Sequence, residues 1–289
     1  MSIDHVTPYL DAAGVCPDPI FVIGSPRSGT TALAQSLGRH PALWVGKESY
    51  LLHDLFTGRR IERMWDRHMQ RVNPCWLAHE KIEQDELLAF IGLGFNALFT
   101  SRSEGKRWID PTPLYTPMVE TIAALFPGAV FVHILRDGRH VVRSMINFER
   151  KFSLEAIARA TPKEIPTWSK DLREGCETWA AWVEVALDFE AAHPTRCITV
   201  RNEDLAADPE TGFAAIADFL GLAPDPGPAT LFAQQRINSS WANETARPDD
   251  DDWSGWTRAQ RKEFLAVAGD TMRRAGYGDG KVLKEWARG

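Results

Sequence analysis

Several features that mark other classes of protein are scarce or missing in this sequence of 289 residues. Its four cysteines lie far apart without a C-x-x-C pair, which argues against a zinc site and a disulfide framework. No apolar run approaches the roughly 18 residues that span a bilayer, and no basic-then-apolar leader opens the chain. We therefore expect a soluble, cytoplasmic protein with reduced thiols. The cysteines are Cys16, Cys75, Cys176 and Cys197.

An excess of positive charge is also absent, since the formal net charge is -6. This balance argues against a general nucleic-acid binder, although Arg27, Arg136 and Arg139 can still form a local basic pocket. The hydrophobic content of 44% is enough for a sizeable core. We expect an N-terminal arm over residues 1–18 and a single domain over residues 19–289.

The most informative missing residue is a lysine in a glycine-containing loop. Gly24 and Gly29 are five positions apart after an apolar strand, as in the phosphate-binding loop G-x-x-x-x-G-K-[ST]. Thr30 stands where that loop needs its lysine, and the positive charge is at Arg27 instead. Backbone N–H groups from Ser28 to Thr31 can still surround an anionic oxygen at the start of a helix. The loop therefore predicts phosphate or sulfate binding without ordinary ATP hydrolysis.

Strand and helix patterns alternate along the chain, which predicts an α/β fold with a parallel β-sheet flanked by helices on both faces. A helical insertion at about residues 51–107 interrupts this alternation and is long enough to build part of a cleft. The expected strands are Ile20–Ile23, Ala129–Leu135 and Cys197–Val200, the last read as buried. The expected helices follow the loop up to Gly38, follow Asp137 through Met145, and cover Gly175–Ala192 and Asp208–Leu220, with Gly221 ending the last. Pro224–Pro228 and Asp249–Asp252 are expected to be a loop and a turn.

A second candidate anion site follows the strand Ala129–Leu135. Arg136 lies at the strand end, and Ser144 lies two helical turns beyond Asp137, the expected N-cap, so both can face one pocket. Arginine supplies a planar fork of donors for phosphate oxygens, and a serine hydroxyl can donate one more hydrogen bond. Arg139 and Arg143 are one turn apart and are equally compatible with a solvated basic face.

These two motifs carry a family resemblance. Pro26–Thr31 resembles the 5′-phosphosulfate loop of sulfotransferases that use 3′-phosphoadenosine 5′-phosphosulfate (PAPS), and Phe131–Ser144 is similar to their 3′-phosphate element. Weaker likenesses at Trp108–Pro113, at Arg201–Leu205 and near Asn238–Ser240 and Trp256 extend the resemblance over roughly residues 19–277. The resemblance implies a P-loop NTPase-like sulfotransferase fold, PAPS as cosubstrate, 3′-phosphoadenosine 5′-phosphate (PAP) as product, and no metal. The residues that it implies for nucleotide binding are Arg27, Ser28, Gly29, Thr30, Thr31, Arg136 and Ser144.

The resemblance also implies the catalytic groups. Glu48 resembles the glutamate base found after the loop in carbohydrate, protein-tyrosine and bacterial members, and Arg27 is expected to stabilise the leaving phosphate. His53 is an alternative base, because the phenol and steroid branch uses histidine, whereas His133 lies in an apolar strand and reads as a core histidine.

The sequence also departs from the family pattern. Many relatives carry a lysine where Pro111 precedes Thr112, and an aromatic residue near the adenine where this chain has Asn202. Trp241, Trp253 and Trp256 are candidates to cover the base, with a structural role equally open for each.

The expected function is sulfuryl transfer from PAPS to a hydroxyl, less often an amine, of an unidentified small-molecule acceptor. One alternative is a P-loop kinase-like enzyme, which would need Mg²⁺ and a lysine at Thr30. The other is a degenerate nucleotide-binding scaffold without turnover, suggested by the missing lysine before Thr112. Acceptor specificity is expected from residues 51–107, 146–175 and 236–256, and the oligomeric state stays open.

Overall fold

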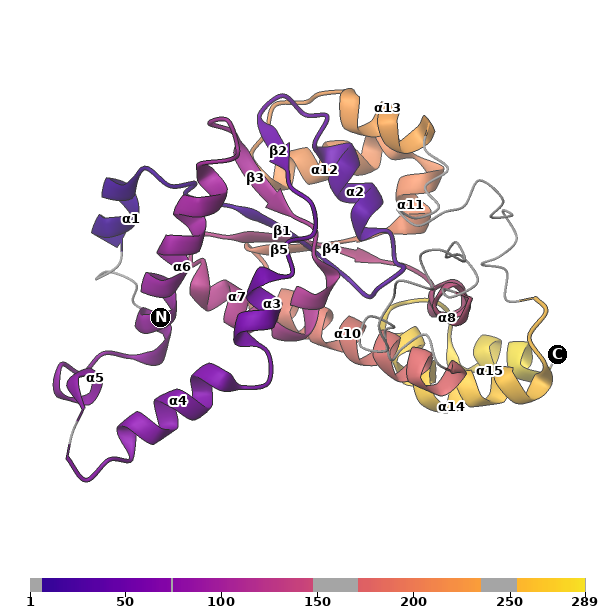
Figure 1. The fold of residues 1–289 in the computed structure, drawn as a ribbon. Helices are drawn as coiled ribbons and strands as arrows, with labels where there is room; N and C mark the ends of the chain where they lie inside the picture. The colour runs from indigo at the N-terminus through magenta and orange to yellow at the C-terminus, as the bar shows by residue number, and fades with distance from the viewer. Residues whose placement is uncertain (1–6, 74, 148–170, 235–253, 289) are drawn as a thin grey trace, which may run out of the picture.

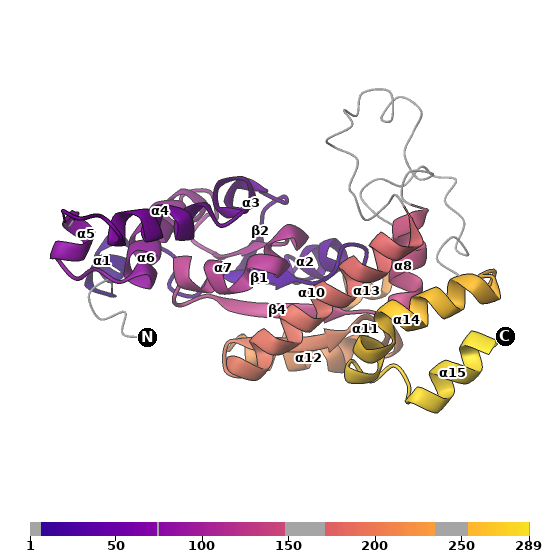
Figure 2. The same cartoon turned by 90° about the horizontal axis from the view of Figure 1, so that it is seen from below.

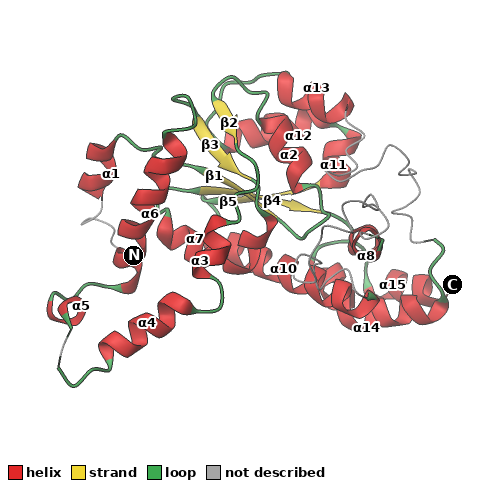
Figure 3. Cartoon of the chain, in the orientation of Figure 1, coloured by secondary structure: helices red, strands yellow, loops and turns green. Residues whose placement is uncertain are grey.

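The computed structural model describes residues 7–73, 75–147, 171–234 and 254–288. Within these residues, five parallel strands form one sheet in the order β2-β3-β1-β4-β5 (Figure 3). The strands are β1 (Ile20–Ile23), β2 (Leu43–Val45), β3 (Arg107–Asp110), β4 (Val130–Leu135) and β5 (Cys197–Arg201). Because all five run the same way, their carboxyl ends meet at one edge, with β1 at the switch in strand order where α/β proteins bind ligands.

Alternation along β1 sends its side chains into two different cores. Phe21 and Ile23 pack with Trp108 and Phe131 on one face of the sheet, whereas Ile20 and Val22 pack on the other face. All four β1 residues are buried, as a central strand covered on both faces requires.

Helices cover both faces of the sheet, and Figure 1 shows them as two layers with the strands between. The first face, below the sheet in Figure 1, packs against α3 (Leu51–Phe56), α6 (Gln84–Thr100), α7 (Val119–Leu125) and α10 (Leu172–Ala192). The second face packs against α2 (Thr30–Leu37), α11 (Asn202–Ala207), α12 (Pro209–Phe219) and α13 (Gly227–Gln234). A third core joins α10 to α8 (Gly138–Ile146), α14 (Arg258–Arg274) and α15 (Gly280–Arg288). The remaining elements are α1 (Thr7–Ala13), α4 (Arg60–Met69), α5 (Trp76–His79) and the 3-10 helix η1 (Pro113–Met118).

The insertion between β2 and β3 consists of α3, α4, α5 and α6. Leu52 and Phe56 of α3 and Leu88 of α6 join the first core, but α4 and α5 bury no residue. Figures 1 and 2 both show α4 and α5 extending away from the sheet, on the side opposite to α14 and α15. No helix in the described part of the chain is long and apolar enough to cross a membrane.

The expected architecture is confirmed, and most differences lie at element ends. α2 ends at Gly38 and α8 begins after Asp137, both as predicted. Gly221 ends α12 with a φ of 65°, a conformation that favours glycine. The prediction that β5 is buried was wrong beyond its first residue, because β5 is an edge strand and only Cys197 is buried.

The predicted loop Pro224–Pro228 was also partly wrong, since α13 already begins at Gly227. Pro228 is tolerated there because the first turn of a helix does not use its N–H groups internally. The expected turn Asp249–Asp252 lies outside the described residues.

Candidate functional site

The loop between β1 and α2 adopts a backbone shape that requires glycine. Gly29 has a φ of 109°, and a Cβ placed there would lie 2.6 Å from the Asn202 Nδ2 atom. Arg27 also has a positive φ, 71°, which is uncommon and strained for a residue with a side chain. The Thr116 hydroxyl of η1 holds the start of the loop by contacting both the N–H and the carbonyl of Gly24, at 2.9 and 3.0 Å.

The loop leaves the N-terminus of α2 without a side-chain cap. Gly29 is the N-cap residue, so it supplies no capping oxygen to the N–H groups of the first turn, which include those of Thr30 and Thr31. Ser28 instead stabilises the loop itself, because its N–H and its hydroxyl both donate to the Ser25 carbonyl, at 3.1 and 2.7 Å. The first turn therefore presents backbone donors and a positive helix end to an anion.

Three of the predicted ligands come together beside this helix end. Arg27 Nε donates to Ser144 Oγ at 3.2 Å, and Arg136 Nη1 donates to the Arg27 carbonyl at 3.3 Å. The three residues come from the loop, from the end of β4 and from the second turn of α8. Two guanidinium groups and a hydroxyl from separate elements thus lie at the carboxyl edge of the sheet, as the sequence predicted.

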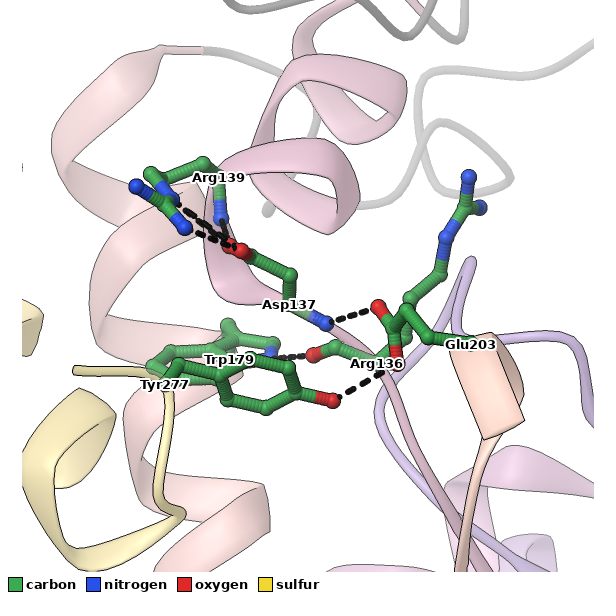
Figure 4. Close-up of polar contacts among 6 residues, drawn as sticks. All are labelled: Arg136, Asp137, Arg139, Trp179, Glu203 and Tyr277. Carbon is green, nitrogen blue, oxygen red and sulfur yellow. Dashed lines mark hydrogen bonds and ion pairs between the residues drawn. The ribbon is translucent and has the colours of Figure 1, made fainter. Parts of the chain in front are cut away.

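A hydrogen-bond network fixes the backbone from which Arg136 projects. Trp179 Nε1 donates to the Arg136 carbonyl at 3.2 Å, and the Asp137 N–H donates to Glu203 Oε1 at 2.9 Å. The Tyr277 hydroxyl donates to the other Glu203 oxygen at 2.9 Å, and burial beside that carboxylate raises the pKa of Tyr277. Figure 4 shows the Arg136 side chain pointing away from this network, toward the loop after β1.

Asp137 closes the N-terminus of α8. Its carboxylate accepts the backbone N–H of Arg139 at 2.9 Å and also pairs with the Arg139 guanidinium, with Nε–Oδ1 at 2.9 Å and Nη2–Oδ2 at 2.5 Å. The Arg139 guanidinium also lies over the Trp286 ring, 5.4 Å from its centroid. These contacts favour a structural role for Arg139, whose side chain is only 16% exposed and so does not form the solvated basic face that the sequence left open.

Glu48 lies after β2 with each carboxylate oxygen accepting one hydroxyl donor. Oε1 accepts from the Thr31 hydroxyl of α2 at 3.3 Å, and Oε2 accepts from the Tyr50 hydroxyl. Burial raises the pKa of Tyr50, and the Glu48 contact raises it further, so the phenol is a neutral donor. Glu48 therefore lies between the uncapped end of α2 and the Tyr50 hydroxyl.

A buried carboxylate that was not singled out from the sequence holds this segment. Asp110, 3% exposed at the end of β3, accepts from the Ser49 hydroxyl at 2.7 Å and from the Thr112 N–H at 2.9 Å. Burial raises the pKa of Asp110, although its hydrogen bonds oppose that shift. The Thr112 hydroxyl in turn accepts the Ser49 N–H at 2.9 Å. The available signal was an aspartate directly after an apolar strand, followed by Pro111.

The alternative residues occupy other environments. His133 is fully buried and contacts Thr199 Oγ1 at 2.9 Å, and burial lowers its pKa to about 3, which confirms the core reading. His53 contacts its neighbour Asp54 at 3.3 Å. Asn202 donates to the Ser28 carbonyl at 3.2 Å, so it supports the loop.

The other tryptophan and loop candidates are only partly described. Trp256 is 3% exposed and packs on Phe264, with ring centroids 5.4 Å apart, so it belongs to the third core. Trp241, Trp253 and Asn238–Ser240 lie outside the described residues.

The chain is similar to known proteins in sequence and in fold. The family model described as "Sulfotransferase family" matches residues 19–226. Protein-tyrosine sulfotransferase A of Caenorhabditis elegans is 26% identical over 211 residues, which cover 71% of this chain and 50% of that protein. The chain thus spans about half the length of the curated relatives it matches.

Two solved structures show the same fold. Sulfotransferase STF9 from Mycobacterium avium aligns with a TM-score of 0.56 at 13% identity, covering 94% of this chain and 80% of that one. Mouse sulfotransferase SULT7A1, solved in complex with PAP, aligns with a TM-score of 0.50 at 17% identity, covering 100% and 95%.

Proposed function

This chain belongs to the sulfotransferase family, and from that premise we propose that it transfers a sulfuryl group from PAPS to a hydroxyl group of an acceptor. The observation that carries the proposal is the meeting of Arg27, Arg136 and Ser144 at the uncapped end of α2. A nucleotide with phosphates at both the 5′ and the 3′ position needs two anion sites, and the neighbouring ends of β1 and β4 would each supply one.

We propose that both backbone and side-chain groups bind the sulfuryl donor. The first-turn N–H groups of Gly29, Thr30 and Thr31 would hold the 5′-phosphosulfate together with Arg27, and Arg136 with Ser144 would hold the 3′-phosphate. Ser28 would complete this group, and its N–H and hydroxyl also shape the loop by donating to the Ser25 carbonyl. PAPS, when bound, supplies an activated sulfuryl group whose departure leaves negative charge on the 5′-phosphate, which Arg27 is placed to stabilise.

Glu48 is the proposed general base. An acceptor hydroxyl that hydrogen-bonds to its carboxylate would give up its proton to Glu48 as the new oxygen–sulfur bond forms, and the bond to the 5′-phosphate oxygen would break with its electron pair. The Thr31 contact connects this base to the helix end that would hold the sulfuryl donor.

The acceptor is proposed to be a small molecule with a hydroxyl group. A tyrosyl side chain of a peptide is a second candidate, because relatives over about 70% of this chain are named protein-tyrosine sulfotransferases. Parallel assays with small alcohols, small phenols and tyrosyl peptides separate the two classes.

The decisive test is calorimetric titration with PAP, AMP, and ATP with Mg²⁺. Binding of PAP alone supports the proposal, and Glu48→Gln should then lower transfer by about 100-fold or more while PAP affinity is kept. Preference for ATP with Mg²⁺ would favour a P-loop kinase-like enzyme, in spite of Thr30 at the lysine position. PAP binding without turnover toward any acceptor class would favour a nucleotide-binding scaffold.

A further inference from the structure

Tyr50 makes the contact with Glu48 that an acceptor hydroxyl must make. Thr31, from the donor side, donates to Glu48 Oε1, which makes Oε2 the oxygen more open to an acceptor. The Tyr50 hydroxyl donates to that oxygen. A neutral hydroxyl hydrogen-bonded to a carboxylate is the arrangement that precedes proton transfer to a general base.

The backbone holds Tyr50 in this position at the cost of strain. Its φ is 53°, in the left-handed region that bulky residues rarely adopt, and it immediately precedes α3. Such strain persists only where the surroundings impose it, and here Ser49 is anchored to the buried Asp110 and to Thr112. The same chain segment therefore fixes the base and turns the phenol back toward it.

Tyr50 also remains accessible from solvent. It is 43% exposed, whereas Tyr115, which contacts Ser49 on the inner side at 2.6 Å, is fully buried. An exposed ring can move outward without opening the core, because its only hydrogen bond recorded in the described structure is the one to Glu48. The backbone thus directs the Tyr50 hydroxyl toward Glu48, but a hydroxyl group entering from solvent can take its place.

We propose that the Tyr50 hydroxyl holds the place of the acceptor hydroxyl on Glu48, and that an acceptor displaces it before transfer. Until then Tyr50 keeps water off Glu48 Oε2 and so limits loss of PAPS to hydrolysis. In that side reaction a water oxygen bonds to sulfur, one water proton goes to Glu48, and the bond to the 5′-phosphate oxygen breaks to give PAP and sulfate. The inference rests on the proposed function, because it takes Glu48 as the base.

The experiment measures release of PAP from PAPS in buffer, with water as the only acceptor. Tyr50→Phe removes only the hydroxyl, so we expect release about tenfold faster than in the wild type, the effect of losing one hydrogen bond to a charged group. Tyr50→Gly should also be faster, and it suits the left-handed backbone, which guards against misfolding as an explanation. The matched control is Tyr9→Phe, on α1 beside Phe90, which should release PAP at the wild-type rate.

Adding Glu48→Gln to Tyr50→Phe should remove the increase. The inference is overturned if Tyr50→Phe and Tyr50→Gly release PAP no faster than the wild type, which would leave Tyr50 a positioning group for Glu48. It is also overturned if the increase survives Glu48→Gln. These outcomes, with PAP still bound in calorimetry, leave the sulfotransferase proposal standing, whereas failure to bind PAP sinks both.

Discussion

Two adjacent strand–turn–helix units of this protein differ in whether a side chain caps the N-terminus of the helix. β1 with α2 and β4 with α8 run side by side in parallel, with Ile20 opposite Val130 and Ile23 opposite His133. α2 begins after Gly29 with no capping side chain, whereas α8 begins after Asp137, whose carboxylate takes the Arg139 N–H. In the proposed function, the first unit would therefore bind an anion with backbone donors, and the second would use the side chains of Arg136 and Ser144.

The largest effect is expected from removing the side-chain site of the second unit. Arg136→Ala should weaken PAP binding by about 10- to 100-fold, since charge-assisted hydrogen bonds to phosphate are lost. Calorimetry with PAP and with adenosine 5′-phosphosulfate, which lacks the 3′-phosphate, should show the loss for PAP alone. Arg139→Ala is the matched control, because Asp137 and Trp286 already engage that side chain. An equal loss in both variants would contradict the division of roles.

Gly29→Ala tests the backbone site of the first unit. The new Cβ would meet Asn202 Nδ2 at 2.6 Å and force alanine into a φ of 109°, so we expect about tenfold weaker PAP binding from strain of about 1–3 kcal/mol. Adding Asn202→Ala to the same chain should restore the share of PAP affinity lost to the close contact. The share lost to the unfavourable φ should remain lost. Full recovery would show that the backbone conformation is not the limiting factor.

Asp137→Ala should affect stability more than binding. Loss of the helix cap costs about 1 kcal/mol, which corresponds to a melting temperature lower by about 2–4 °C in a protein of this size. Urea unfolding and calorimetry on the same samples separate the two quantities. If PAP affinity fell as far as in Arg136→Ala, Asp137 would contribute to binding, and its role would not be limited to capping α8.

Ser144→Ala should give the smallest change. One hydrogen bond to Arg27, at 3.2 Å, is removed, and a severalfold loss of PAP affinity is expected from about 0.5–1.5 kcal/mol. Ser144→Thr keeps a hydroxyl and serves as the comparison in the same titration. A loss larger than that of Arg136→Ala would reverse the order of the two ligands.

What the sequence predicted well depends on local signals. The β1 loop, the end of α2 at Gly38 and the cap at Asp137 each follow from a few consecutive residues whose backbone preferences act within one turn. The approach of Arg136 to Arg27 was also predicted, because parallel strands bring their carboxyl ends to one edge.

The remaining features depend on contacts between distant segments. Ser49 reaches Asp110 across 61 residues, and no periodicity in the sequence reports such a contact. β2 has three residues, too few for a pattern, and the edge position of β5 follows from strand order, which the sequence did not determine. Tyr50 was missed because its orientation comes from an unusual φ in a short segment.

The insertion between β2 and β3 leaves and rejoins the sheet at neighbouring strands, since Leu43 is paired with Arg107. No residue of its outer helices α4 and α5 is fully buried, and the cost of closing a loop grows only slowly with length. Residues 60–79, which carry α4 and α5, are therefore the part of the insertion that can change with the least effect on the core. A chain built this way can acquire a different outer surface by replacing that segment, while the strand ends of β1 and β4 keep their arrangement.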